Sequence, residues 1–208
     1  MILWGNEHEA RAKALATACN ETAADIAGLS VSSEGIQAPA CSDATLTIWG
    51  HGDETSLAEL LDVQMGQLIQ NWRTRNSALK TVELVTCNAQ HNQNPLAGYA
   101  TRVAKFVERK YRDVVVKALP KGQYADDYSI LWAAPNPPAF CYITAPSKTT
   151  FDHANQLFKT LEPQKNYDLA AVATDMAKAR TLAEPNNFTV MSSTLGSLRP
   201  MLVTIKTA

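Results

Sequence analysis

Two side chains that can act in acid–base and nucleophilic chemistry, His51 and Cys87, each stand just beyond a short apolar run. His51 lies between two glycines after the run 45–49, and Cys87 directly follows the run 82–86. A cysteine attacks a carbonyl as its thiolate, and a neighbouring imidazole can take up or stabilise the thiol proton. A dyad of Cys87 and His51 would therefore be suited to acyl transfer.

Backbone groups beside these two residues could hold the oxyanion that acyl transfer creates. Gly52 has no side chain, so its N–H can come close to a substrate carbonyl, and the N–H of Cys87 is the natural second donor. Each residue also has a structural interpretation. A cysteine at the end of a strand is often a small buried apolar group, and a single histidine is often a hydrogen-bonded surface group. Spacing alone leaves both interpretations open.

Capping signals, apolar periodicity and β-branched runs along the chain predict the helices and strands that must position these residues. A Ser56-x-x-Glu59 capping box, followed by apolar residues three and four apart, predicts a helix after the first run. A second helix is predicted to begin at Asn94-Pro95, with proline in its first turn. Runs rich in β-branched residues predict three strands, at 45–49, 82–86 and 114–119.

The N-terminal part extends this alternation. Residues 1–4 predict a strand, and the alanine-rich stretch 7–29 predicts a helix on which His8 is solvated. Strands and helices that alternate through short joins predict right-handed crossovers, and hence an α/β fold with a mostly parallel central sheet and helices on both faces. Ligands bind beyond the carboxyl ends of such strands, which lie about 4.8 Å apart. We therefore expect His51 and Cys87 to approach each other there.

Beyond Gly122 the alternation ends. We expect residues 1–146 to form the core domain and residues 147–208 to form a C-terminal α+β extension packed on the same domain. The elements expected in this part are strands at 130–134, 139–145, 188–194 and 201–206 and helices at 150–162 and 167–183.

The composition, 46% hydrophobic and 19% charged over 208 residues, is typical of a globular protein. Nineteen Lys and Arg against twenty Asp and Glu give a net charge of −1, which argues against a strongly basic nucleic-acid binder. No apolar run approaches the ~20 residues that a membrane span requires. We therefore expect neither nucleic acid nor a membrane span.

Four cysteines are scattered without Cys-x-x-Cys pairs, so we expect reduced thiols rather than a disulfide scaffold. The sequence has no compact set of metal ligands and no phosphate-binding or dinucleotide-binding glycine motif, and we predict no metal and no cofactor. The N-terminal residues lack a positively charged segment before an apolar stretch. We expect a cytoplasmic protein, or one exported without a conventional signal peptide in the manner of an effector.

The segments 47–53 (TIWGHGD) and 82–88 (VELVTCN) resemble the caspase/gingipain/clostripain clan of cysteine peptidases. That clan places a His-Gly dipeptide after one apolar strand and the nucleophilic cysteine after the next. Within the clan, the chain is most similar to the autoprocessing cysteine protease domains of large bacterial toxins. Those domains continue with a helix that carries a Tyr-Ala pair, here Tyr99-Ala100, and the resemblance covers residues 45–119.

The resemblance implies a caspase-like three-layer sandwich and a cysteine endopeptidase that acts on a protein or peptide substrate, in a bacterial toxin or effector. Cys87 matches the nucleophile, His51 the general base or charge-stabilising histidine, and Gly52 the oxyanion glycine. Substrate-binding residues would follow the third strand, where Asp126 and Asp127 could select a basic side chain. An exposed acidic turn is the alternative interpretation of these two aspartates.

Other interpretations fit the same residues. The toxin domains are activated by inositol hexakisphosphate in a strongly basic pocket, whereas this chain has no dense Lys/Arg cluster, so a small-molecule activator stays unidentified. A non-catalytic interaction module on this fold, or a Cys/His deamidase or acyl transferase, are the alternative functions. Asp53 is either a third member of the site or a carboxylate in the first turn of the following helix.

Overall fold

The computed structural model divides the chain into two units. The first contains residues 1–121 together with 199–208, and the second contains residues 122–198. This division differs from the expected boundary between residues 146 and 147, because the last ten residues return to the first unit. The structure describes residues 1–5, 8–29, 31–32, 35–87, 89–90, 96–120, 123–125, 139–145, 147–159, 183–186, 189–194 and 198–207.

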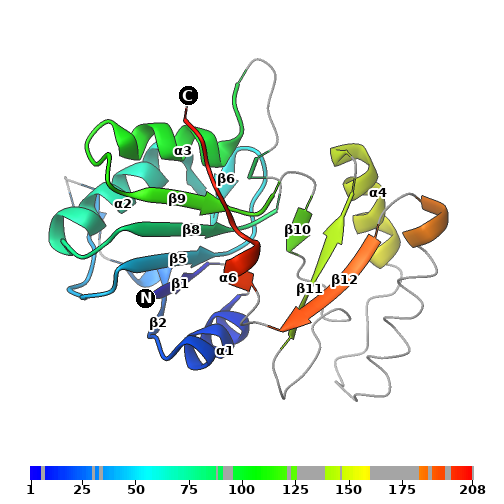
Figure 1. Cartoon of the computed structure of the whole chain (residues 1–208), viewed down its shortest axis with the longest axis horizontal. Helices are drawn as coiled ribbons and strands as arrows, with labels where there is room; N and C mark the ends of the chain where they lie inside the picture. The colour runs from blue at the N-terminus through cyan, green and yellow to red at the C-terminus, as the bar shows by residue number, and fades with distance from the viewer. Residues whose placement is uncertain are drawn as a thin grey trace. The chain divides into compact units, whose positions relative to one another are not determined.

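A six-stranded sheet forms the centre of the first unit (Figure 1). Its strands, in spatial order, are β13 (Val203–Thr204), β9 (Val115–Ala118), β8 (Thr81–Val85), β5 (Thr45–Trp49), β1 (Ile2–Trp4) and β2 (Ala23–Asp25). Every pairing is parallel except that of β13 with β9. The predicted α/β fold with a mostly parallel sheet is therefore confirmed, and strand 45–49 has its predicted bounds.

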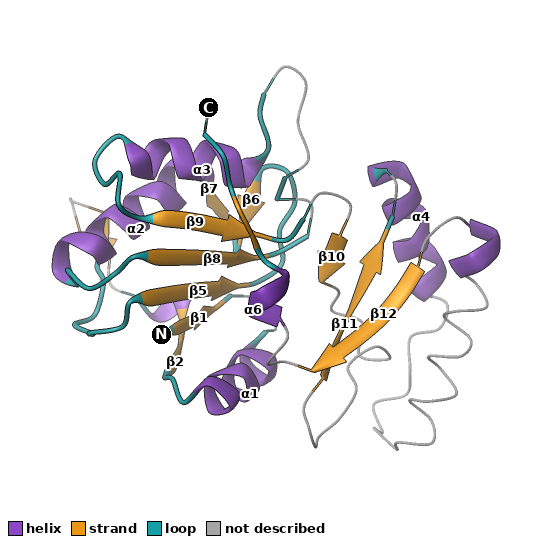
Figure 2. Ribbon diagram, viewed as in Figure 1, coloured by secondary structure: helices purple, strands orange, loops and turns teal. Residues whose placement is uncertain are grey.

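Helices cover both faces of this sheet (Figure 2). The chain runs from β1 outward to β2 through α1 (Glu9–Cys19), and then from β5 in the other direction through α2 (Asp62–Arg75) and α3 (Tyr99–Glu108). Right-handed crossovers in opposite directions place α1 on one face and α2 with α3 on the other. The order in which the chain adds strands to the sheet therefore reverses at β1: β2 is added on one side of β1, and β5, β8 and β9 are added on the other.

The face under α2 and α3 is the main hydrophobic core. Alternate strand residues point to it because side chains in a strand alternate between faces. Trp72 of α2 and Tyr99 of α3 are fully buried against these strand residues. The strand residues in the core are Leu3, Leu46, Ile48, Val82, Leu84, Val116 and Ala118.

The face under α1 buries Ile2, Leu15 and Trp49, but it also buries the polar side chains of Thr47 and Glu83. The short helix α6 (Leu198–Met201) brings Arg199 to these two residues. One face of the sheet is thus apolar and the other is mixed.

The predicted helix 7–29 is shorter than expected. Helix α1 ends at Cys19 because Asn20 adopts a left-handed conformation (φ 54°), and the chain then forms β2. Asparagine tolerates this conformation better than most residues do. The sheet therefore gains a strand that the alanine-rich pattern concealed.

The predicted capping box at Ser56 and Glu59 is wrong. Residues 56–61 form a hairpin of β6 (Ser56–Leu57) and β7 (Leu60–Leu61), in which Ala58 and Glu59 have φ of 49° and 66°. Two left-handed central residues are the signature of a type I′ turn. Helix α2 begins only at Asp62, where Gln64 Oε1 accepts a hydrogen bond from the Leu61 N–H at 3.0 Å.

The helix predicted from Asn94-Pro95 begins instead at Tyr99, after Gly98. Residues 94 and 95 lie outside the described residues. A two-strand hairpin of β3 (Val31–Ser32) and β4 (Gly35–Ile36) completes the first unit. Among the described residues, no helix is both long and apolar enough to cross a membrane.

The second unit contains an antiparallel sheet in the order β10 (Gln123–Ala125), β11 (Ala139–Thr144) and β12 (Thr189–Thr194), with helix α4 (Lys148–Lys159). The predicted strands 139–145 and 188–194 and helix 150–162 are present. The predicted strand 130–134 and nearly all of the predicted helix 167–183 lie outside the described residues. The predicted strand 201–206 is only β13, and it belongs to the first unit.

Candidate functional site

The register of β5 and β8 fixes where His51 and Cys87 lie. Trp49 pairs with Val85 at the carboxyl end of the two strands, and the Gly50 N–H still donates to Val85 O at 3.3 Å. His51 and Cys87 each stand two residues beyond that last pair, so both belong to the same edge of the sheet. His51 is exposed and Cys87 is half-buried, so both can be reached from solvent.

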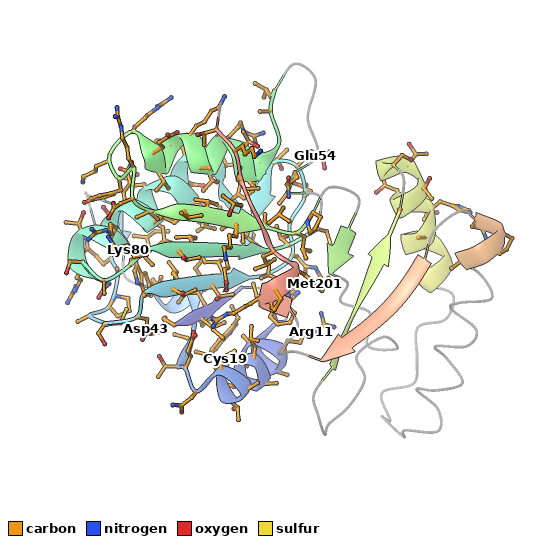
Figure 3. All side chains as sticks on the ribbon, in the orientation of Figure 1. Arg11, Cys19, Asp43, Glu54, Lys80 and Met201 are labelled. Carbon is orange, nitrogen blue, oxygen red and sulfur yellow. The ribbon has the colours of Figure 1, made fainter. Side chains whose placement is uncertain are left out.

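The edge that holds these residues is visible in Figure 3. Glu54 is labelled on the loop beyond β5, at the edge toward which the parallel strand arrows point, and Lys80 is labelled at the opposite edge, just before β8. Ligands of open parallel sheets bind beyond the carboxyl ends. The dyad residues therefore lie on the edge where chemistry is expected.

The loop that carries His51 is an ordered hairpin. The Ala58 N–H donates to His51 O at 2.8 Å, and the Asp53 N–H donates to Ser56 O at 3.0 Å. Gly52 lies opposite Leu57 in this bridge. In such a non-hydrogen-bonded pair, the flanking residues make the bonds. The Gly52 N–H therefore takes no part in the hairpin ladder, as an oxyanion donor requires.

Gly52 is also a site of close approach. A Cβ built on it would overlap Ser56 O and the Thr86 Oγ1 atom. Thr86 is buried and directly precedes Cys87. The absence of a side chain at Gly52 thus allows the His51 loop to pack against the strand end that carries Cys87.

Asp53 belongs to the turn of this hairpin. Its Oδ1 accepts hydrogen bonds from the Thr55 N–H (2.6 Å), the Thr55 hydroxyl (2.5 Å) and the Ser56 N–H (3.0 Å). An aspartate that bonds to the backbone two and three residues on stabilises a turn. Asp53 therefore stabilises the turn of the hairpin. The alternative that it lies in the first turn of the following helix is wrong, because α2 begins at Asp62.

Helix α3 braces both loops of the site through the pair Tyr99-Ala100. The Tyr99 hydroxyl donates to Leu60 O in the hairpin at 2.9 Å, and the Ala100 N–H donates to Ala89 O, two residues beyond Cys87, at 2.7 Å. Burial, and then the charge of Asp62, raise the pKa of Tyr99. The phenol therefore stays protonated and keeps its donor.

Arg102, one turn further along α3, ties the same region together. Its guanidinium donates to Glu54 O at 3.1 Å and to Ala97 O at 2.5 Å, and its Nε lies 3.2 Å from Asp62 Oδ2. These contacts join the His51 loop, the start of α2 and the segment before α3. The candidate site is therefore built on a fixed scaffold rather than on a free loop.

His8 is the residue of this region that sequence reasoning missed. The prediction that it is solvated is wrong, because only 2% of it is exposed. Its ring stands edge-to-face against His51, with 4.7 Å between ring centroids. The sequence pattern gives no signal for this contact, because His8 reaches the site only through the order of strands in the sheet, in which β5 lies beside β1.

Asp126 and Asp127 lie outside the described residues. Cys19, Cys41 and Cys87 are free thiols. Within the described part of the chain, no group of three or more His, Cys, Asp or Glu side chains could hold a metal ion.

The arrangement brings an exposed imidazole, a half-buried thiol and a backbone donor to one edge of a braced parallel sheet. Comparison of the chain with models of protein families, with curated proteins and with solved structures finds no match.

Proposed function

We propose that the protein is a cysteine endopeptidase of caspase-like fold, with Cys87 as nucleophile and His51 as its acid–base partner. The observation that carries the proposal is the register of β5 and β8, which brings the two residues to the same positions beyond neighbouring strand ends. This is the arrangement that the resemblance to the caspase/gingipain/clostripain clan implies. The Gly52 N–H, left out of the hairpin ladder, supports an oxyanion site beside them.

The chemistry follows in two steps. The Cys87 thiolate attacks the carbonyl carbon of the scissile peptide, a C–S bond forms, and the negative charge moves to the carbonyl oxygen, which the Gly52 N–H stabilises. The C–N bond then breaks as protonated His51 donates a proton to the leaving amine. A water molecule loses a proton to His51, attacks the acyl group and releases the Cys87 thiolate.

The substrate is a protein or peptide, and the setting is that of a bacterial toxin or effector, as the resemblance implies. If Asp126 and Asp127 line the substrate pocket, the preferred side chain is basic. Cleavage of peptides that differ only in Lys, Glu or Leu before the scissile bond tests this preference.

The first test of the proposed function measures thiol reactivity and needs no known substrate. Alkylation with iodoacetamide, followed by mass spectrometry of each cysteine peptide, gives separate rates for Cys87, Cys19 and Cys41. We expect Cys87 to react fastest near neutral pH and to slow in His51→Ala. The matched control is His153→Ala, because His153 is exposed in the second unit and its Nε2 pairs with Asn186 Oδ1 at 2.9 Å.

The second test identifies the reaction. A host-cell lysate treated with the wild-type protein should contain new protein termini that are absent after treatment with Cys87→Ala or His51→Ala. A +1 Da shift at glutamine or asparagine with no new termini would replace the peptidase by a deamidase. Full biological activity in both variants would replace it by a non-catalytic interaction module.

A further inference from the structure

The β1–α1 turn brings a second imidazole to the candidate site. His8 is buried, and its ring contacts His51 edge-to-face at 4.7 Å and Trp49 at 6.2 Å with a tilt of 45°. Edge-to-face contacts between aromatic rings have a preferred geometry, so each ring restricts the other. His51 is exposed, and its contact with the buried His8 ring restricts the rotamers that its side chain can adopt.

The backbone around His8 is fixed on both sides. The His8 N–H donates to Gly5 O at 3.4 Å, and His8 O accepts from Ala12 N–H at 2.9 Å as the first bond of helix α1. The Gly5 N–H donates to Trp49 O at 2.9 Å, which joins the turn to the end of β5.

The hairpin that carries His51 packs on the same turn. A Cβ on Gly5 would overlap the Cβ of Ala58, so hairpin and turn are in close contact there. The Ala58 N–H in turn donates to His51 O. The contact between the two imidazoles is therefore supported by close packing of the segments that carry them.

We propose that His8 is a positioning residue, whose buried ring holds the His51 imidazole in the orientation that serves Cys87. This inference rests on the proposed function. The contact that carries this role is the edge-to-face packing of the two rings. A phenyl ring at position 8 should therefore preserve the effect.

The experiment compares His8→Ala with His8→Phe by site-resolved alkylation from pH 5 to pH 9, on the full chain. In His8→Ala, we expect the rate at Cys87 at pH 7 to fall about tenfold and its pH profile to flatten, because a misplaced base costs one to two orders of magnitude in rate. The rates at Cys19 and Cys41 should stay unchanged, which separates this effect from unfolding. In His8→Phe, the Cys87 rate and profile should return to within about threefold of wild type.

Two alkylation outcomes overturn the proposal: a wild-type Cys87 profile in His8→Ala, or an equal loss in His8→Phe. NMR signals of the His51 ring separate this inference from the proposed function. Removal of the His8 ring should shift those signals, and His8→Phe should retain a ring-current shift. If Cys87 reactivity is independent of His51, the proposed function fails, whereas unchanged His51 signals in His8→Ala overturn the positioning role alone.

Discussion

The neighbouring strands β5 and β8 carry polar side chains in two places. We call the middle of the two strands the inner level and the positions just beyond their carboxyl ends the outer level. The inner level is buried, whereas solvent can reach the outer level. In the middle of the strands, Thr47 and Glu83 face each other in register, and the Thr47 hydroxyl donates to Glu83 Oε2 at 2.6 Å. Both are buried, and Arg199 Nε lies 2.9 Å from the same carboxylate oxygen. Four residues further along each strand stand His51 and Cys87, which solvent can reach.

The inner level is a closed network. Arg199 also donates to Thr47 Oγ1 at 2.8 Å and to both carboxylate oxygens of Glu21, at 2.5 and 3.0 Å. Burial alone would lower the pKa of Arg199, but the hydrogen bonds to Glu21 and the charge of Glu83 outweigh it and raise the pKa. Buried charges are tolerated when oppositely charged groups lie beside them, as Glu21 and Glu83 lie beside Arg199.

The same two strands thus hold a buried ion-pair network in one place and the proposed nucleophile and base in another. A buried polar group needs complete pairing, whereas a nucleophile and a base need access to substrate. Changes at the inner level should therefore alter the free energy of unfolding, and changes at the outer level should alter reactivity.

The largest effect is expected at the outer level. Cys87→Ala should lower the rate of substrate cleavage at least about a thousandfold, because the proposed acyl-enzyme forms on the Cys87 sulfur. The free energy of unfolding should change by less than about 1 kcal/mol, since Cys87 is only half-buried. Peptide cleavage and urea denaturation measure the two quantities, with Cys19→Ala as the control for loss of a thiol.

Removal of Arg199 should be the largest change at the inner level. Arg199→Met leaves Glu83 buried without its cation, and we expect a loss of about 3 kcal/mol in the free energy of unfolding. The double variant with Glu83→Gln should recover part of that loss. Urea denaturation of wild type, both single variants and the double variant gives the coupling energy between Arg199 and Glu83. A coupling near zero would mean that the inner level is not stabilised by this ion pair.

Gly52→Ala should lower the cleavage rate, because the added methyl group does not fit between the His51 loop and the end of β8. The added Cβ overlaps Ser56 O and Thr86 Oγ1, so the backbone donor must move. Loss of an oxyanion donor lowers the rate about a hundredfold. Gly28→Ala is the matched control, because a Cβ there meets nothing within 4 Å. Equal rates in both variants would remove Gly52 from the site.

Acid should weaken the inner level. Burial alone would raise the pKa of Glu21, but the hydrogen bonds from Arg199 and from the N-terminal amine together outweigh it and hold the pKa below its ordinary value of 4.5. The folded protein then binds fewer protons than the unfolded chain, so this stability is complete above about pH 4.5 and is lost as the pH falls through the lowered pKa. Thermal melts from pH 3 to pH 7 should show a smaller acid dependence in Glu21→Gln than in wild type.

The smallest effect is expected from an exposed ion pair far from both levels. Asp113 lies 2.5 Å from Lys80 Nζ and 3.2 Å from Arg73 Nη2, and hydrogen bonds from these two residues lower its pKa. Exposed pairs contribute little to stability. Asp113→Asn should leave both the melting temperature and Cys87 alkylation close to wild type, and a large loss in either would contradict the ranking.

Strands β1, β5, β8 and β9 and the shared edge of His51 and Cys87 were predictable from the sequence. A run such as 45–49 is rich in β-branched residues, and parallel strands joined by helices must place their carboxyl ends together. The hairpin at 56–61 was not predictable in this way. Its capping-box letters are overridden because the Asp53 carboxylate binds the N–H groups of the turn and two residues adopt left-handed conformations.

Contacts between residues far apart in the sequence could not be predicted, for a different reason. Periodicity assigns Glu83 to a strand, but it cannot say that Arg199, more than a hundred residues later, will reach it. It likewise places His8 near the start of a helix without showing that β5 ends beside it. Both contacts depend on strand order, which short-range signals do not determine.

The return of the chain at residue 199 makes the second unit an insertion rather than an appendage. The chain leaves the first unit after residue 121 and comes back to supply Arg199 and the edge strand β13. A truncation after residue 146 would remove both, while excision of 122–198 with a flexible bridge would keep all six strands. The C-terminal ten residues are, in this sense, the closing part of a fold that begins with Ile2.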